Sequence, residues 1–67
     1  MINIIVNGDK MSVDVDIVLQ GLIDKLKVGD KIMATAINGN VIKKNMWQNT
    51  TLKDSDKIEF LAFVGGG

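Results

Sequence analysis

The sequence lacks three residue types that carry much of protein side-chain chemistry, because it has no cysteine, no histidine and no arginine. Without thiols and imidazoles it offers no thiolate nucleophile, no histidine base and no usual transition-metal cluster. Its eight lysines balance eight acidic residues, without the basic stripe and arginine forks that are typical of nucleic-acid binders. We therefore expect a protein that is not itself an enzyme, holds no metal or cofactor and does not bind nucleic acid.

Long apolar runs are also missing, since no stretch approaches the 18 or so residues that a membrane span needs. No basic-then-apolar leader precedes Ile2, so we expect a soluble cytoplasmic protein without a membrane partner. The chain has 67 residues, of which 46% are hydrophobic, and this suffices for one small core.

Two pairs of carboxylates, Asp14/Asp16 and Asp54/Asp56, are the remaining candidates for acid–base chemistry or for a hard cation site. Aspartates at such spacings are more typical of solvent-facing strand positions and of turns. We predict a structural role for both pairs.

Alternating apolar residues predict a hairpin at the start of the chain. Ile2, Ile4 and Val6 alternate along a first strand, and Asn7-Gly8 then supplies the turn residues that tolerate positive φ. The return strand is predicted from Met11, Val13 and Val15.

Between Ile17 and Lys27 the apolar period changes to three and four residues, which predicts a helix with Asp16 as its N-cap. Gly29-Asp30 is expected to break this helix. A strand is predicted over 32–37, a turn at Asn38-Gly39 and a short strand at 41–42. The segment 43–49 is too short for more than a turn of helix, and the last strand is predicted over 58–64.

This order of elements predicts an α+β protein with the β-grasp, or ubiquitin-like, layout. We expect a mixed sheet of four to five strands with one helix packed on one face. Residues 1–64 would form the β-grasp domain, and 65–67 a flexible C-terminal glycine tail.

The tail itself, Gly65-Gly66-Gly67, follows directly on a predicted strand. Glycine has no Cβ, so such a tail can enter a narrow channel and adopt backbone angles closed to other residues. Three extended residues reach about 10 Å, which suits placing a terminal carboxylate inside a partner's active site.

The last strand has two faces, and the charge of Glu59 indicates that its face is the outer one. Leu61 and Phe63 share that face, so we predict that they form a partner-binding patch beside the tail, together with Ile5. Trp47, the one tryptophan, is expected to anchor its loop on the core.

With these elements in place, the chain resembles the ThiS family of sulfur carriers in thiazole biosynthesis. The resemblance rests on Ala36-Ile37-Asn38-Gly39, Trp47, Asp54-x-Asp56-x-Ile58 and the glycine tail, and it extends to Ile4-x-Val6-Asn7-Gly8. The most specific element is the pair of glycines at the end of a β-grasp domain.

The resemblance implies a mechanism without side-chain catalysis. A ThiF-type activating enzyme would use ATP to adenylate the carboxylate of Gly67. Sulfur from a donor such as a cysteine desulfurase would replace AMP, and the resulting thiocarboxylate would supply thiazole synthase during thiamine biosynthesis.

Alternative functions remain open at this stage. The small subunit of molybdopterin synthase uses the same terminal chemistry for another product, and a ubiquitin-like modifier role is also compatible with the tail. A β-grasp interaction module without covalent chemistry is the alternative from a different class.

Overall fold

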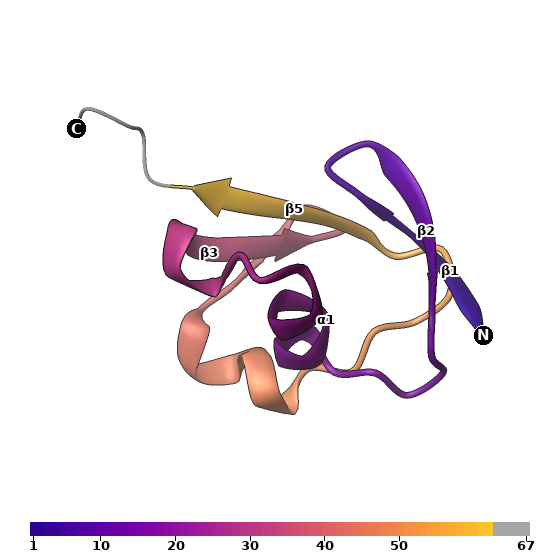
Figure 1. Cartoon of the computed structure of the whole chain (residues 1–67). Helices are drawn as coiled ribbons and strands as arrows, with labels where there is room; N and C mark the ends of the chain where they lie inside the picture. The colour runs from indigo at the N-terminus through magenta and orange to yellow at the C-terminus, as the bar shows by residue number, and fades with distance from the viewer. Residues whose placement is uncertain (63–67) are drawn as a thin grey trace.

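The computed structural model describes residues 1–62 and confirms the predicted β-grasp layout (Figure 1). One five-stranded mixed sheet has the strand order β2-β1-β5-β3-β4. The helix α1 lies on one face of this sheet, with the short helix η2 beside it. The elements are β1 (Ile2–Val6), β2 (Asp9–Val13), α1 (Leu19–Leu26), η1 (Gly29–Lys31), β3 (Ile32–Ile37), β4 (Asn40–Ile42), η2 (Lys44–Asn49) and β5 (Lys57–Ala62).

Both predicted Asn-Gly turns are present, one between β1 and β2 and the other between β3 and β4. Asn7 has a φ of 49° and Asn38 a φ of 51°, the left-handed region that asparagine tolerates better than most residues. The return strand β2, however, ends at Val13, so its predicted extension to Val15 is wrong. Val15 lies in a turn closed by the Ile17 N–H, which donates to the Asp14 carbonyl oxygen.

The helix α1 begins at Leu19, two residues later than predicted, and Asp16 does not cap it. Val18 occupies the N-cap position without a side-chain hydrogen bond, and Asp16 sits in the preceding turn with a φ of 68°. The Leu19 N–H donates instead to the carbonyl oxygen of Thr50, at 2.7 Å. A distant backbone segment thus satisfies one of the amides that capping side chains usually satisfy.

The helix ends at Leu26, before the predicted Gly29-Asp30 break. Lys27 is the C-cap in the left-handed conformation, and its N–H donates to the Asp24 carbonyl oxygen at 3.2 Å. Gly29 then begins the short helix η1, which leads directly into β3. The strand β3 has the bounds that the sequence predicts.

The segment after β4 forms the 3₁₀ helix η2, whose six residues make about two turns, so the prediction of no more than one turn is wrong. The structure confirms that Trp47 anchors this part of the chain on the core. The Trp47 side chain is buried, and its Nε1 donates to the Ile42 carbonyl oxygen at 3.0 Å. The Lys44 Nζ lies over the indole ring, 5.7 Å from its centre.

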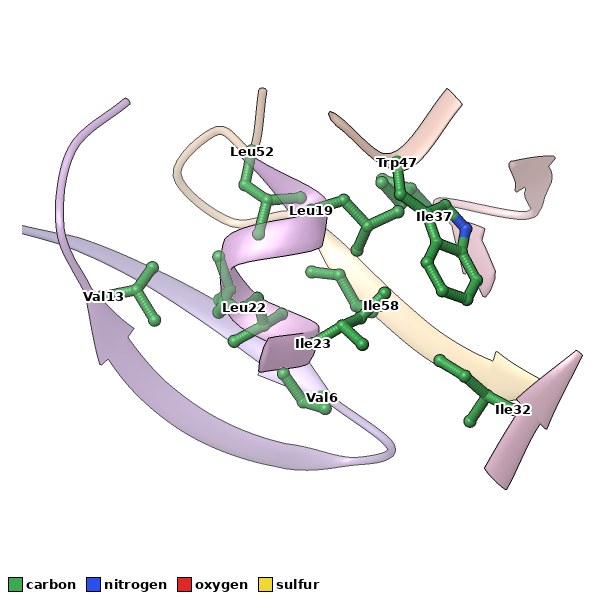
Figure 2. Close-up of a cluster of buried hydrophobic side chains, with 11 residues drawn as sticks. Val6, Val13, Leu19, Leu22, Ile23, Ile32, Ile37, Trp47, Leu52 and Ile58 are labelled. Carbon is green, nitrogen blue, oxygen red and sulfur yellow. The ribbon is translucent and has the colours of Figure 1, made fainter. Parts of the chain in front are cut away.

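The hydrophobic core lies between the sheet and α1 (Figure 2). Leu19, Leu22 and Ile23 of α1 face the sheet, where Ile58 of β5 lies among them, fully buried as they are. The core lies on this face only. Among the described residues, no helix covers the other face of the sheet. No helix among residues 1–62 combines the length and apolar character needed to cross a bilayer.

Candidate functional site

The strand β5 occupies the centre of the sheet and runs toward the C-terminal glycines. It pairs in parallel with β1 and antiparallel with β3. A segment that follows β5 therefore begins at an interior strand, which pairs with β3 along most of its length and with β1 at its first two residues, rather than at a loosely held edge. This is a suitable base for presenting a chain end to a partner.

Side chains along β5 alternate between the two faces as the sequence predicts. Ile58 is buried against α1, and Phe60 packs against the same core. Glu59 and Leu61 point away, and Leu61 remains 40% exposed. The inference from the charge of Glu59 thus identified the outer face correctly for these residues.

Apolar residues of β3 and β4 lie near Leu61 on this outer face, together with the charged Glu59 of β5. The register places Ala34 of β3 opposite Leu61 and Ala36 opposite Glu59, while Val41 of β4 lies opposite Ala36. Paired residues share a face, so these side chains extend from Leu61 across β3 to β4. Val41 is 60% exposed.

A β-bulge in β3 adds one more apolar side chain. The pairing with β5 skips Met33, between Ile32 and Ala34, so two residues of β3 oppose Leu61. Met33 is 56% exposed. We call the set Met33, Ala34, Ala36, Val41 and Leu61 the outer apolar patch, in which Met33, Val41 and Leu61 are exposed and Ala36 is buried between its neighbours. Sequence reasoning missed Met33 and Val41, although hairpin parity around Asn38-Gly39 already places Val41 opposite Ala36.

Ile5 lies on the same outer face but not beside Leu61. It pairs with Lys57, four residues earlier on β5, which corresponds to about 13 Å along the strand. There the half-buried Ile5 side chain helps to line a shallow groove of about 490 Å³, with Asn3, Lys10, Ser12 and Ser55. The structure therefore brings Ile5 and Leu61 to one face without joining them in one cluster.

The remaining predicted site residues are Phe63, Gly65, Gly66 and Gly67. All of them lie outside the described residues, as does the predicted continuation of the last strand to Val64. Their roles, like the partner-binding roles of Ile5 and Leu61, stay predictions.

The second aspartate pair organises the loop before β5, in the structural role predicted for it. Asp54 Oδ1 accepts the Asn3 N–H at 2.8 Å. Asp56 Oδ2 accepts the Lys53 N–H at 2.8 Å, and its Oδ1 accepts from Asn38 Nδ2 at 2.9 Å. Within residues 1–62, no three acidic side chains gather closely enough to hold a metal ion.

Comparison with known proteins connects this arrangement to one family. The ThiS family model matches residues 3–67. The crystal structure of the thiamine biosynthesis protein ThiS from Geobacter metallireducens is similar, with a TM-score of 0.82 and 36% sequence identity over 98% of this chain and 100% of that chain. A solution structure of a thiamine biosynthesis protein from the same organism gives a TM-score of 0.76 at 36% identity, over 98% of this chain and 88% of that chain.

Of two further relatives, one is close to this chain in length and the other is much longer. The protein ycf40 of Porphyra purpurea is 30% identical over 66 residues, which make up 98% of this chain and 93% of the relative. A thiazole synthase of Paramagnetospirillum magneticum is 27% identical over 64 residues, or 96% of this chain. The chain spans only 20% of the length of that thiazole synthase.

Proposed function

The chain belongs to the ThiS family, which supports a sulfur-carrier role in thiamine biosynthesis, and we propose that the Gly67 carboxylate is the group that carries the sulfur. The observation that carries this proposal is the family match, which runs through the three glycines to residue 67. The fold agrees with it, because β5 leads from the centre of the sheet toward these glycines.

The proposed reaction begins with activation of a poor electrophile. A Gly67 carboxylate oxygen attacks the α-phosphorus of ATP in a ThiF-type enzyme, pyrophosphate leaves, and an acyl-adenylate forms. The terminal sulfur of a persulfide, supplied through a cysteine desulfurase, then attacks the carbonyl carbon and AMP leaves. A thiol opens the resulting acyl disulfide, is oxidised to a disulfide, and releases the Gly67 thiocarboxylate.

The chain contributes reach and steric access to this chemistry rather than acid–base groups. The absence of histidine and cysteine fits a protein that is acted upon, with ATP bound by the partner enzyme. Side chains on Gly65 or Gly66 would widen the segment that has to enter the partner, whereas glycines allow it to be enclosed and shielded from water.

Thiazole synthase is the receiver of the sulfur in this proposal. A protein named thiazole synthase contains a segment similar to nearly the whole of this chain. Two units that are joined in one polypeptide commonly work on the same substrate, which favours thiazole formation over molybdopterin formation.

The outer apolar patch offers a surface on which the activating enzyme can dock. Leu61 and Met33 present exposed apolar area beside the end of β5, and Phe63 follows two residues after Leu61. We include Ile5 as a more distant contact on the same face. Burial of such side chains at an interface would hold the glycine segment close to the reaction centre.

The test is a measurement of intact mass. The full chain is incubated with a ThiF-type enzyme, ATP, cysteine and a cysteine desulfurase, and we expect a mass gain of one sulfur-for-oxygen exchange. Fragment spectra should place the gain on Gly67, and omission of ATP should abolish it. An unchanged mass, with an activating enzyme that converts another ThiS protein in parallel, would contradict the proposal.

A further inference from the structure

Two asparagines hold β5 from opposite sides. Asn7 and Asn38 occupy equivalent positions in the two Asn-Gly turns, with nearly equal φ. Each accepts a hydrogen bond on its side-chain Oδ1 from a backbone N–H of β5. Asn38 Oδ1 accepts from Lys57 N at 3.0 Å, and Asn7 Oδ1 accepts from Phe60 N at 3.0 Å.

The two contacts act at different ends of β5. Lys57 is the first residue of the strand, next to the loop that precedes it. Phe60 lies three residues later, directly before Leu61 and toward the glycines. The same type of contact therefore secures the beginning of β5 through Asn38 and its C-terminal half through Asn7.

Asn7 continues the contact with β5 directly after β1 ends at Val6. Pairing between β1 and β5 ends at Val6 and Ile58, and the Asn7 N–H donates to the Ile58 carbonyl oxygen at 2.9 Å. Because alternate residues of a strand direct their backbone groups to the same side, Phe60 N is the next amide on this side. The chain turns away at Asn7, so its side chain replaces the missing backbone acceptor.

On the other side of β5, the neighbouring strand β3 is irregular next to Leu61. The Met33 bulge opposes Leu61, and bulges bend a strand and increase its twist. The direction of β5 beyond Phe60 is thus set by a bulged neighbour on one side and by the Asn7 side chain on the other. Without Asn7, the direction of this part of the strand would be fixed from one side only.

We propose that Asn7 is a positioning residue, which orients the end of β5 so that the C-terminal segment reaches the activating enzyme in a productive geometry. This inference rests on the proposed function. The Asn7–Phe60 hydrogen bond is exposed to solvent, so water can replace it and its loss should disturb the direction of the strand more than the stability of the fold.

Substitution by glycine tests this role with a matched control. Glycine accepts positive φ, so Asn7→Gly and Asn38→Gly both keep their turns while removing the side-chain acceptor. Asn38 makes two side-chain hydrogen bonds in these contacts, to Lys57 N and to Asp56, whereas Asn7 makes the one to Phe60 N. We expect Asn38→Gly to lower the melting temperature more, and Asn7→Gly to lower activation more.

The measurement is ATP–pyrophosphate exchange by a ThiF-type enzyme, with each full-length chain as substrate and below its melting temperature. Small misplacements of reacting groups cost up to about 100-fold, and we expect Asn7→Gly to lower kcat/KM by about tenfold. Asn38→Gly should stay within about twofold of the unsubstituted chain. Asn7→Asp keeps an oxygen acceptor and tolerates the turn, so it should restore most of the activity.

Amide hydrogen exchange supplies a readout that does not depend on activity. Exchange at the Phe60 amide should accelerate in Asn7→Gly but not in Asn38→Gly. Exchange at the Lys57 amide should accelerate in Asn38→Gly but not in Asn7→Gly. Equal losses of kcat/KM in both glycine variants, failure of Asn7→Asp to restore activity, or an unfolded Asn7→Gly chain would each overturn the positioning role. An unsubstituted chain that is not activated at all would instead contradict the proposed function.

Discussion

The indole Nε1 of Trp47 donates a hydrogen bond to the carbonyl oxygen of Ile42, and this contact joins η2 to the last residue of β4. Trp47 is 1% exposed, so its ring fills space in the core while its polar edge satisfies a backbone acceptor. The tryptophan therefore contributes both packing and a hydrogen bond to the same site.

Trp47→Phe should destabilise the fold by about 2 kcal/mol, because it removes ring volume and leaves the Ile42 carbonyl without its donor. The free energy of unfolding is measured by urea titration and followed by circular dichroism, since the substitution removes the tryptophan signal. Met46→Ala is the control in the same helix, where the exposed side chain should matter by less than about 0.5 kcal/mol. Equal stability of the two variants would contradict this role of Trp47.

A buried hydroxyl predicts a substitution that stabilises the fold, in contrast to Trp47→Phe. Thr35 of β3 is fully buried, and its Oγ1 has no hydrogen-bond partner among the described residues. Thr35→Val keeps the shape and removes this unsatisfied group, so it should stabilise the protein by about 1 kcal/mol. The melting temperature should rise by about 4–8 °C in a domain of this size.

Thr50 is the matched control for Thr35, because its Oγ1 donates to the Met46 carbonyl oxygen at 2.7 Å. Thr50→Val removes a hydroxyl whose hydrogen bond is exposed to solvent, so it should lower stability by less than about 0.5 kcal/mol. A Thr35→Val variant that melts at the same temperature as Thr50→Val, or below it, would show that the Thr35 hydroxyl is not a cost to the fold.

The two faces of β5 predict opposite signatures for two neighbouring substitutions. Leu61→Asp places a charge on an exposed position, so it should leave the melting temperature nearly unchanged. It should weaken binding to the activating enzyme by about 2 kcal/mol, as loss of an apolar anchor does. Phe60→Asp forces a charge against the core and should unfold the domain.

Thermal melts and a binding titration by calorimetry separate these outcomes. Phe63→Asp, two residues beyond Leu61, is expected to behave like Leu61→Asp if it shares the outer face. Unimpaired binding by Leu61→Asp would remove the outer apolar patch from the interface. The docking surface would then have to be sought around the groove that Ile5 lines.

Local sequence patterns predicted the features that depend on nearby residues. Asn7-Gly8 and Asn38-Gly39 specify their turns through backbone angles that few other residues adopt, so both turns were predicted correctly, although β2 ends at Val13. The alternation of side chains along a strand is also a local property, and it placed Leu61 on the same outer face as Glu59.

Features that depend on distant segments were not predictable from local patterns. The start of α1 is fixed by a hydrogen bond from Leu19 to Thr50, and Thr50 lies far along the chain. Likewise, the exposure of Met33 follows from a bulge in its pairing with β5. The separation of Ile5 from Leu61 follows from the parallel register of β1 and β5, which neither strand encodes alone.

The last prediction concerns steric access to Gly67. Gly66→Val, or one residue added after Gly67, should lower adenylation by on the order of 100-fold, because a branched side chain or a displaced carboxylate cannot reach the reacting position. The melting temperature should change little, since the core of the domain is formed by residues that precede the glycines. Adenylation is followed by ATP–pyrophosphate exchange. The control carries the same added residue before Met1, which is 80% exposed, and it should remain fully active. Normal exchange by the C-terminally extended chain would show that the Gly67 carboxylate is not the group that the enzyme activates.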